Sequence, residues 1–198
     1  GEDMVATLRM WQAETAPTAD QTRLVRQIFM DEAAALESAD SPCIPFRYEA
    51  DQPSMAKHRD TDPPSKLGDG VGGNPVTDSV QYNHDVRITL DMIEPHAIRQ
   101  VRVMAHHRDE VQPNVAYKID RIRVLTSSDR QTWNMESEIC REATERSYVL
   151  TIPVKTRTRY LRLDVSKCAD AARVLISEIE VIGEREAGGR ELLLEPRL

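Results

Sequence analysis

Apolar residues recur at every second position in several short runs between residues 86 and 181. In the first run, Val86, Ile88 and Leu90 alternate with Arg87 and Thr89. Successive side chains of a β-strand point to opposite faces, so this period predicts strands with one buried and one solvated face. The other segments expected as strands are 101–105, 121–124, 131–136, 148–154, 161–165 and 179–181.

The connections between these runs are short and polar, as in Ser127-Ser128-Asp129-Arg130. The segments between them lack the 3.6-residue period of a helix, so a parallel sheet with helical crossovers is not expected. The pattern predicts a mainly β fold, built as an antiparallel sandwich or barrel. Arginines at alternate strand positions are expected on the solvated faces, at Arg99, Arg102, Arg121, Arg123, Arg159 and Arg162.

The two ends of the chain differ from this β region. Residues 1–40 carry apolar side chains at helical spacing, from Leu24 to Leu36, and are expected as a helical lead-in or the end of a preceding domain. The β-sandwich is expected over 41–183. Residues 184–198 are expected as a C-terminal tail, with an extra strand at Leu192-Leu193-Leu194 as the alternative.

Composition limits the partners of the chain. The net charge of -7 argues against nucleic acid, because phosphates are repelled by an acidic surface. No apolar run approaches the ~20 residues of a membrane helix. The three cysteines, Cys43, Cys140 and Cys168, are too far apart for a CxxC metal clip. Buried free thiols are predicted, and one disulfide is left open.

A long proline-rich stretch precedes the strands. Residues 41–73 contain five prolines and end in the glycine-punctuated run Lys66-Leu67-Gly68-Asp69-Gly70. Near the far end of the chain, Ser177-Glu178-Ile179-Glu180-Val181 is a strand with alternating acidic residues. A loop of this length in a compact domain is usually functional or held by a metal. The two runs together predict a seat for a structural cation.

Five segments, in order, resemble the discoidin or coagulation-factor type C domains, which are galactose-binding-like jelly rolls. The resemblance is closest to carbohydrate-binding modules appended to bacterial glycoside hydrolases. It covers about residues 45–183, although Gly68 and Ser177 depart from the Thr and Asp usual there. The segments that carry it are 58–70, 88–103, 123–133, 159–163 and 176–183.

The resemblance implies an antiparallel jelly-roll β-sandwich and non-catalytic binding. It implies a carbohydrate-binding module of a larger extracellular glycan-active enzyme, which tethers that enzyme to glycan beside a neighbouring catalytic domain. Localisation outside the cell or in the periplasm follows from the resemblance alone. The alternative is a structural module that packs on a catalytic domain or partner protein without binding sugar. A third reading has the chain lend a loop to a neighbour's enzyme site.

The resemblance also implies calcium in the opening loop. The ligands carried over are the carboxylate of Asp69, the carbonyls of Leu67 and Gly72, and Glu178 from the last strand. Calcium takes six to eight oxygens, many of them from backbone carbonyls, so an Asp-bearing glycine loop suits it. The ion would be structural. The alternative is that Asp69-Gly70 makes only a tight turn and Glu178 lies on the surface.

Sugar sites in such modules lie on the loops at one end of the sandwich. An aromatic ring stacks on the sugar face while polar side chains supply directional hydrogen bonds. The residues expected there are Tyr82, His84, His106, Arg108 and Asn114. Solvated loop residues are the alternative. A zinc pair at His106 and His107 is disfavoured, because neighbouring strand residues point to opposite faces. Trp133 is expected in the core.

The sequence offers only weak candidates for a catalytic site. Ser127, Ser128 and Asp129 form a turn without a glycine-flanked nucleophile or a nearby base. Glu178 and Glu180 share a strand face, and their spacing alone does not define a glycosidase pair. No phosphate loop or dinucleotide fingerprint is present in the sequence. The chain is therefore predicted to be a binding module and not an enzyme.

Overall fold

The computed structural model describes residues 42–55, 58–61, 65–109, 115–140 and 147–184. The expectations for residues 1–40, for Asn114 and for the tail beyond Glu184 lie outside these ranges. The described elements are β1 (Arg47–Ala50), the short 3₁₀ helix η2 (Lys66–Gly68), β2 (Val80–Tyr82), β3 (Val86–His106), β4 (Ile119–Ser127), β5 (Asn134–Cys140), β6 (Ser147–Lys167) and β7 (Val174–Gly183).

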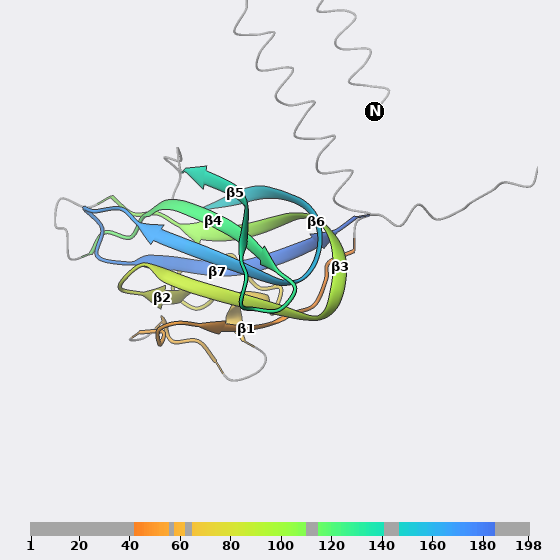
Figure 1. Cartoon of the computed structure of the whole chain (residues 1–198). Coiled ribbons are helices and arrows are strands. Elements are labelled where there is room, and N and C mark those ends of the chain that lie inside the picture. The colour runs from red at the N-terminus through yellow and green to blue at the C-terminus, as the bar shows by residue number, and fades with distance from the viewer. Residues whose placement is uncertain (1–41, 56–57, 62–64, 110–114, 141–146, 185–198) are drawn as a thin grey trace, which may run out of the picture. The chain divides into compact units, whose positions relative to one another are not determined.

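Two long strands, β3 and β6, organise the fold. They run antiparallel along most of their lengths, from the pair Val86 and Val165 to the pair His106 and Ser147. The first part of β3 and the last part of β6 form one layer with β1, β4 and β5. The last part of β3 and the first part of β6 form the other layer with β7 and β2. The predicted antiparallel jelly-roll sandwich is confirmed, and Figure 1 shows both long strands curving between the layers.

The curvature coincides with breaks in strand register. The β3–β6 pairing shifts between Asp91 and His96 and again between Ile98 and Gln100. Ile93 on β3 has φ 72° and Lys155 on β6 has φ 52°, so each long strand has one left-handed residue where it bends. Bulges of this kind bend a strand and increase its twist. They allow one continuous strand to serve two layers.

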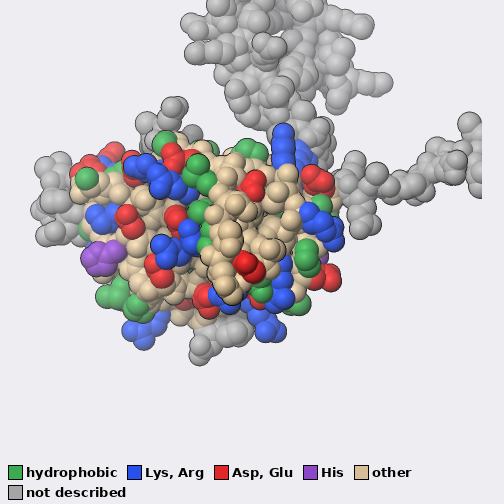
Figure 2. All heavy atoms as spheres, viewed as in Figure 1, with side chains coloured by type: hydrophobic (Ala, Val, Ile, Leu, Met, Phe, Trp, Pro, Cys, Tyr) green, Lys and Arg blue, Asp and Glu red, His purple; other side chains and the backbone are tan. Residues whose placement is uncertain are grey.

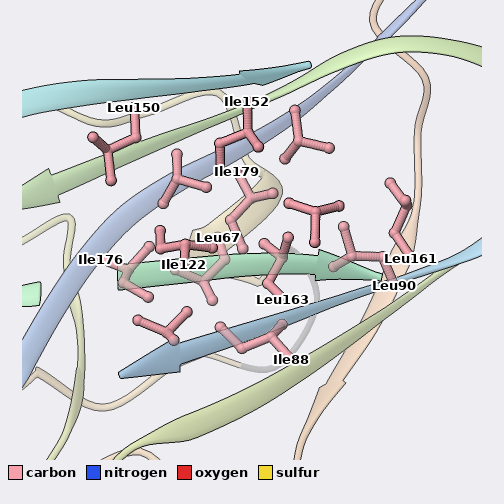
Figure 3. Packing of buried hydrophobic residues seen from close by; sticks show 14 of the residues in the cluster. Leu67, Ile88, Leu90, Ile122, Leu150, Ile152, Leu161, Leu163, Ile176 and Ile179 are labelled. Atoms are coloured by element: carbon pink, nitrogen blue, oxygen red, sulfur yellow. The ribbon is translucent and has the colours of Figure 1, made fainter. Parts of the chain in front are cut away.

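The space between the layers is filled by the alternating apolar residues of the sequence. Val86, Ile88 and Leu90 are buried, whereas Arg87, between Val86 and Ile88, is exposed, as the period of two predicted. Figure 3 shows Ile88, Leu163, Ile152 and Ile179 converging with Leu67 on this core. Fully burying a side chain of this size contributes about 1.5–3 kcal/mol. The core is therefore the main source of stability.

The outer face of the β1–β4 layer carries a row of alternating charges. Register places Arg87, Asp164, Arg123 and Glu138 side by side across β3, β6, β4 and β5. Figure 2 shows Lys, Arg, Asp and Glu side chains interspersed on the face in view. The prediction of a core position for Trp133 is wrong, because its ring is half-buried outside the core with the guanidinium of Arg162 4.7 Å from its centroid.

The cysteines are all free thiols in the described structure, which confirms that part of the prediction. Their burial is different from the prediction, since Cys43 and Cys140 are exposed and Cys168 is half-buried. Within the described ranges, no helix is both long enough and apolar enough to cross a membrane.

Candidate functional site

The opening loop is fixed to the sandwich by a buried leucine and a central aspartate. Leu67 on η2 is fully buried and belongs to the core cluster. Asp60 accepts a hydrogen bond from the hydroxyl of Tyr48, and its Oδ1 accepts the N–H of Lys66 at 3.0 Å. Because the aspartate bonds both β1 and the loop, it holds the loop in position before the glycine run begins.

Glu178 on β7 faces the glycine run. Its side chain is buried, and Oε2 accepts the N–H of Gly70 at 3.2 Å. Burial and the negative charge of Asp69 raise the pKa of Glu178 to about 7, although the loop amides oppose this shift. Asp69 is exposed, and its Oδ1 accepts the N–H of Val71 at 2.8 Å. The structure thus brings the two predicted carboxylates together.

Gly72 lies directly on β7 and β3. A Cβ atom at this position would come within 2.7 Å of the Met104 Sδ and within 3.2 Å of the Glu178 Cβ. The backbone therefore approaches the sheet so closely that a side chain at this position would require the Met104 side chain to move. Gly72, Leu67, Asp69 and Glu178 lie in one loop–strand contact. Among the described residues, however, no three His, Cys, Asp or Glu side chains are grouped to hold a metal.

His106 is not at the surface, and its prediction as a sugar ligand is corrected. The side chain is only 1% exposed. Its Nδ1 hydrogen-bonds with the hydroxyl of Ser147 at 2.9 Å, and its Nε2 hydrogen-bonds with the hydroxyl of Ser177. Burial lowers the pKa of His106. Ser177, which departs from the Asp usual at this position, is thus a partner for a neutral buried imidazole.

One end of the sandwich is formed by residues 107–109 and 115–118, which are the described parts of the β3–β4 loop, and by the β6–β7 loop (168–173). Figure 1 shows this end where β7 begins. The base of the β3–β4 loop is closed by reciprocal backbone bonds between Arg108 and Tyr117, at 3.0 and 3.2 Å. The N–H of Lys118 donates to the carbonyl of Arg173 at 3.1 Å, and that of Cys168 donates to the carbonyl of Lys118 at 3.2 Å. The two loops therefore share a backbone frame.

A charged cluster joins the same two loops. The ammonium of Lys118 contacts Oδ1 of Asp109 and lies 2.6 Å from Oδ2 of Asp170. Nε2 of His107 is 3.0 Å from the other oxygen of Asp109. Hydrogen bonding to both carboxylates raises the pKa of Lys118, and its ammonium lowers the pKa of Asp109 and of Asp170.

The structure buries some of the residues predicted to bind sugar and exposes others. Tyr82 is 1% exposed at the end of β2, so the prediction that its ring stacks on a sugar is wrong. His84 and Arg108 are exposed, His84 in the β2–β3 turn and Arg108 in the β3–β4 loop. Asn114 lies outside the described residues. Two of the five predicted residues are therefore placed where a ligand can reach them.

Sequence reasoning missed the residues that build this end. Tyr117 is half-buried, and its backbone bridges both Arg108 and Arg173. Arg173 donates from Nη1 to the side-chain oxygen of Gln81 at 3.3 Å, and Gln81 in turn donates to Asn83 at 2.7 Å. Tyr117 and Lys118 follow a stretch without strand period, and nothing in their local sequence indicates that 168–173 lies beside them.

Comparison with solved structures identifies the fold. No family model matches the chain, and no curated protein does. A carbohydrate-binding module of the protein AlyQ, in complex with 4,5-unsaturated mannuronic acid, is 15% identical, with 71% of this chain and 97% of that chain covered at a TM-score of 0.50. A pectin-binding module is 17% identical, with 74% and 94% covered, also at 0.50.

A third similar structure comes from Clostridium perfringens. It is a module of a family 89 protein in complex with N-acetylgalactosamine-β-1,3-galactose, 14% identical, with 71% of this chain and 99% of that chain covered at a TM-score of 0.50. The chain therefore shares the fold of these carbohydrate-binding modules, as the sequence resemblance predicted.

Proposed function

We propose that this chain is a non-catalytic carbohydrate-binding module of a larger extracellular glycan-active enzyme. The observation that carries the proposal is the loop end: two loops on a shared backbone frame, with Arg108 exposed and the Tyr117 ring half-buried at their base. The similar modules, which bind mannuronate, pectin and an amino-sugar disaccharide, support the same ligand class.

The chemistry of the loop end suits a sugar. Carbohydrate sites combine an aromatic face with directional polar groups. In this proposal Tyr117 takes the aromatic role that was predicted for Tyr82, while Arg108 and His84 supply hydrogen bonds. Bound glycan would raise the local concentration of a neighbouring catalytic domain at its substrate, because linkage makes the second encounter intramolecular.

We further propose a structural calcium ion at the opening loop. Its ligands would be the carboxylates of Asp69 and Glu178 and the carbonyls of Leu67 and Gly72. Burial and the charge of Asp69 raise the pKa of Glu178, and a bound cation would offset both effects. Calcium can be coordinated by many carbonyl oxygens together with few carboxylates. The ion would pin the loop to β7 and would take no part in sugar contact.

A glycan array tests the main proposal. The wild-type chain is applied with calcium and again with chelator, beside the variants Arg108→Ala and Arg157→Ala. Arg157 is the matched control, because it is exposed on β6 near the bend, where it lines a hollow with Pro42 and Gly183. Glycan retention by the wild type and R157A, lost in R108A without a change in melting temperature, is the expected result.

The second candidate function is a structural module that packs on a catalytic domain or partner protein. The low aromatic content of 5% and the burial of Tyr82 favour it, since both reduce the surface for sugar stacking. An array on which the wild-type chain retains no glycan, with calcium or with chelator, would overturn the carbohydrate proposal in favour of this one.

A further inference from the structure

Lys118 occupies an unusual position between the two loops of the carbohydrate end. Its side chain is 14% exposed, whereas those of Asp109 and Asp170 are 70% and 68% exposed. One carboxylate belongs to the β3–β4 loop and the other to the β6–β7 loop, 52 residues from Lys118. Lys118 is therefore the least exposed member of a three-residue group, the 109–118–170 clasp, whose two carboxylates come from different loops.

The clasp lies on the backbone frame already described. The main chain of Lys118 bonds the β6–β7 loop twice, through its N–H to Arg173 and its carbonyl to Cys168. The main chain of Ala172 adds a third bond, donated to Ala116 at 3.0 Å. Arg108 immediately precedes Asp109 in the sequence. The backbone that carries the exposed Arg108 therefore lies next to the clasp.

We propose that Lys118 is a positioning residue for glycan binding, which holds the β3–β4 and β6–β7 loops at the spacing that the sugar requires. This inference rests on the proposed function. Lys118 acts through Asp109 and Asp170 and does not itself contact sugar, because its ammonium is engaged by both carboxylates and its side chain is largely covered.

Loss of the clasp should affect glycan affinity more than the free energy of folding. Ion pairs with exposed partners contribute little to the free energy of folding, since solvent screens them. Loss of the clasp should therefore leave the sandwich folded. The backbone bonds between the loops remain without the clasp, but the segments that carry Asp109 and Asp170 lose a side-chain tie. These segments must then be ordered when ligand binds, and this ordering weakens affinity. A positioning role predicts lost affinity and local loosening with an unchanged core.

The test uses Lys118→Met, which keeps the apolar stem and removes the charge. Lys118→Arg is the conservative rescue, and Lys155→Met, at an exposed lysine on the bend of β6, is the matched control. The probes are N-acetylgalactosamine-β-1,3-galactose, pectin and 4,5-unsaturated mannuronate, and the one that the wild type binds most tightly is titrated. We expect K118M to weaken binding about tenfold and K118R and K155M to stay close to wild type.

Hydrogen exchange supplies a readout without ligand. The amides of Tyr117, Cys168 and Ala172 should exchange faster in K118M, while amides of the core strands and the melting temperature stay unchanged. Asp170→Asn should weaken binding to a similar degree, and K118M with D170N should lose no more than either alone, because both changes open the same contact. If D170N left affinity intact while K118M lost it, Lys118 would contact sugar directly and the proposal would be overturned.

The failures are distinguishable. Unchanged glycan affinity in K118M, in a wild type that binds, overturns the positioning role and leaves the proposed function standing. Unchanged exchange at both loops also overturns the positioning role. A wild type that binds none of the three probes overturns the positioning role together with the proposed function for these sugars.

Discussion

Arg159 on β6 donates two parallel hydrogen bonds to Asp91 on β3, from Nε to Oδ1 at 2.8 Å and from Nη2 to Oδ2 at 3.0 Å. The same Oδ1 accepts the N–H of Ile93 at 2.8 Å. Bidentate pairs of this kind fix orientation as well as distance. The pair therefore ties β6 to the point at which β3 leaves its first register.

This pair predicts a pH dependence of stability. Hydrogen bonding to Arg159 lowers the pKa of Asp91 below its ordinary value. In the unfolded chain the pKa of Asp91 is about 3.9, so the unfolded state binds the proton more tightly than the folded state. The contribution is therefore complete above that value and is lost as the pH falls through the folded pKa. Asp91→Asn should lower the urea midpoint at pH 6, and the difference from wild type should shrink as the pH falls below about 3.9.

Asp120→Asn is the control for this titration, because Asp120 is an exposed carboxylate at the start of β4 that accepts from its neighbour Arg121. Its midpoint should stay near wild type throughout. An Asp91→Asn difference that is equal at pH 6 and in acid would assign the effect to the bend at Ile93 instead of the charge pair.

Ile93 predicts a stabilising substitution. Its φ of 72° is left-handed, which costs a non-glycine residue about 1–2 kcal/mol. The side chain is 60% exposed, so little packing would be lost on replacement. Asparagine tolerates this conformation, and Ile93→Asn should raise the free energy of unfolding by about 1 kcal/mol. Met135→Asn, at an exposed apolar position on β5 with negative φ, should give no gain; equal gains in both would remove the strain argument.

The alternating period was enough to predict an antiparallel sandwich or barrel, because a strand with one buried face shows its burial in its sequence; the choice of the sandwich came from the family resemblance. Ile88, Leu163 and Val181 were placed in the core on this basis and lie there. The same pattern could not show that β3 and β6 each serve both layers. That depends on bends at Ile93 and Lys155, two residues whose types do not favour positive φ.

The site was less accessible to sequence reasoning. Tyr82 and His106 are residue types that often bind ligands, yet both are buried. Tyr82 lies on the short strand β2, and His106 is hydrogen-bonded to two serines. Lys118 reads as one solvated lysine, since the sequence does not show that Asp170 lies beside it. Local pattern determines which side of a strand is buried, whereas a loop-end site is assembled by contacts between segments far apart in the chain.

The burial of Leu67 predicts how much free energy of unfolding is lost when the opening loop loses its anchor in the core. Its side chain is fully buried between the layers, and truncation of a buried leucine to alanine costs about 2–5 kcal/mol. Leu67→Ala should lower the free energy of unfolding by this amount in chemical denaturation. Val71→Ala, at an exposed position four residues later, should change it by less than about 0.5 kcal/mol. Equal effects would show that the loop is not anchored by its leucine.

The calcium proposal predicts a specific loss in Glu178→Gln. A ligand that binds only the folded state stabilises it by about 2.7 kcal/mol at a concentration one hundred times its Kd. Wild type should therefore melt at a higher temperature in calcium than in chelator. Glu178→Gln should lose this difference, because the buried carboxylate that faces Gly70 is gone.

In chelator, Glu178→Gln should melt no lower than wild type, since a neutral amide avoids both the burial of a charge and the repulsion from Asp69 that raise the pKa of Glu178. Glu94→Gln, at an exposed position on the bend of β3, is the control and should keep the full calcium response. Differential scanning calorimetry of the three proteins makes the comparison. A wild type whose melting temperature is the same in calcium and chelator would show that the loop is held by the Gly70 and Leu67 contacts alone.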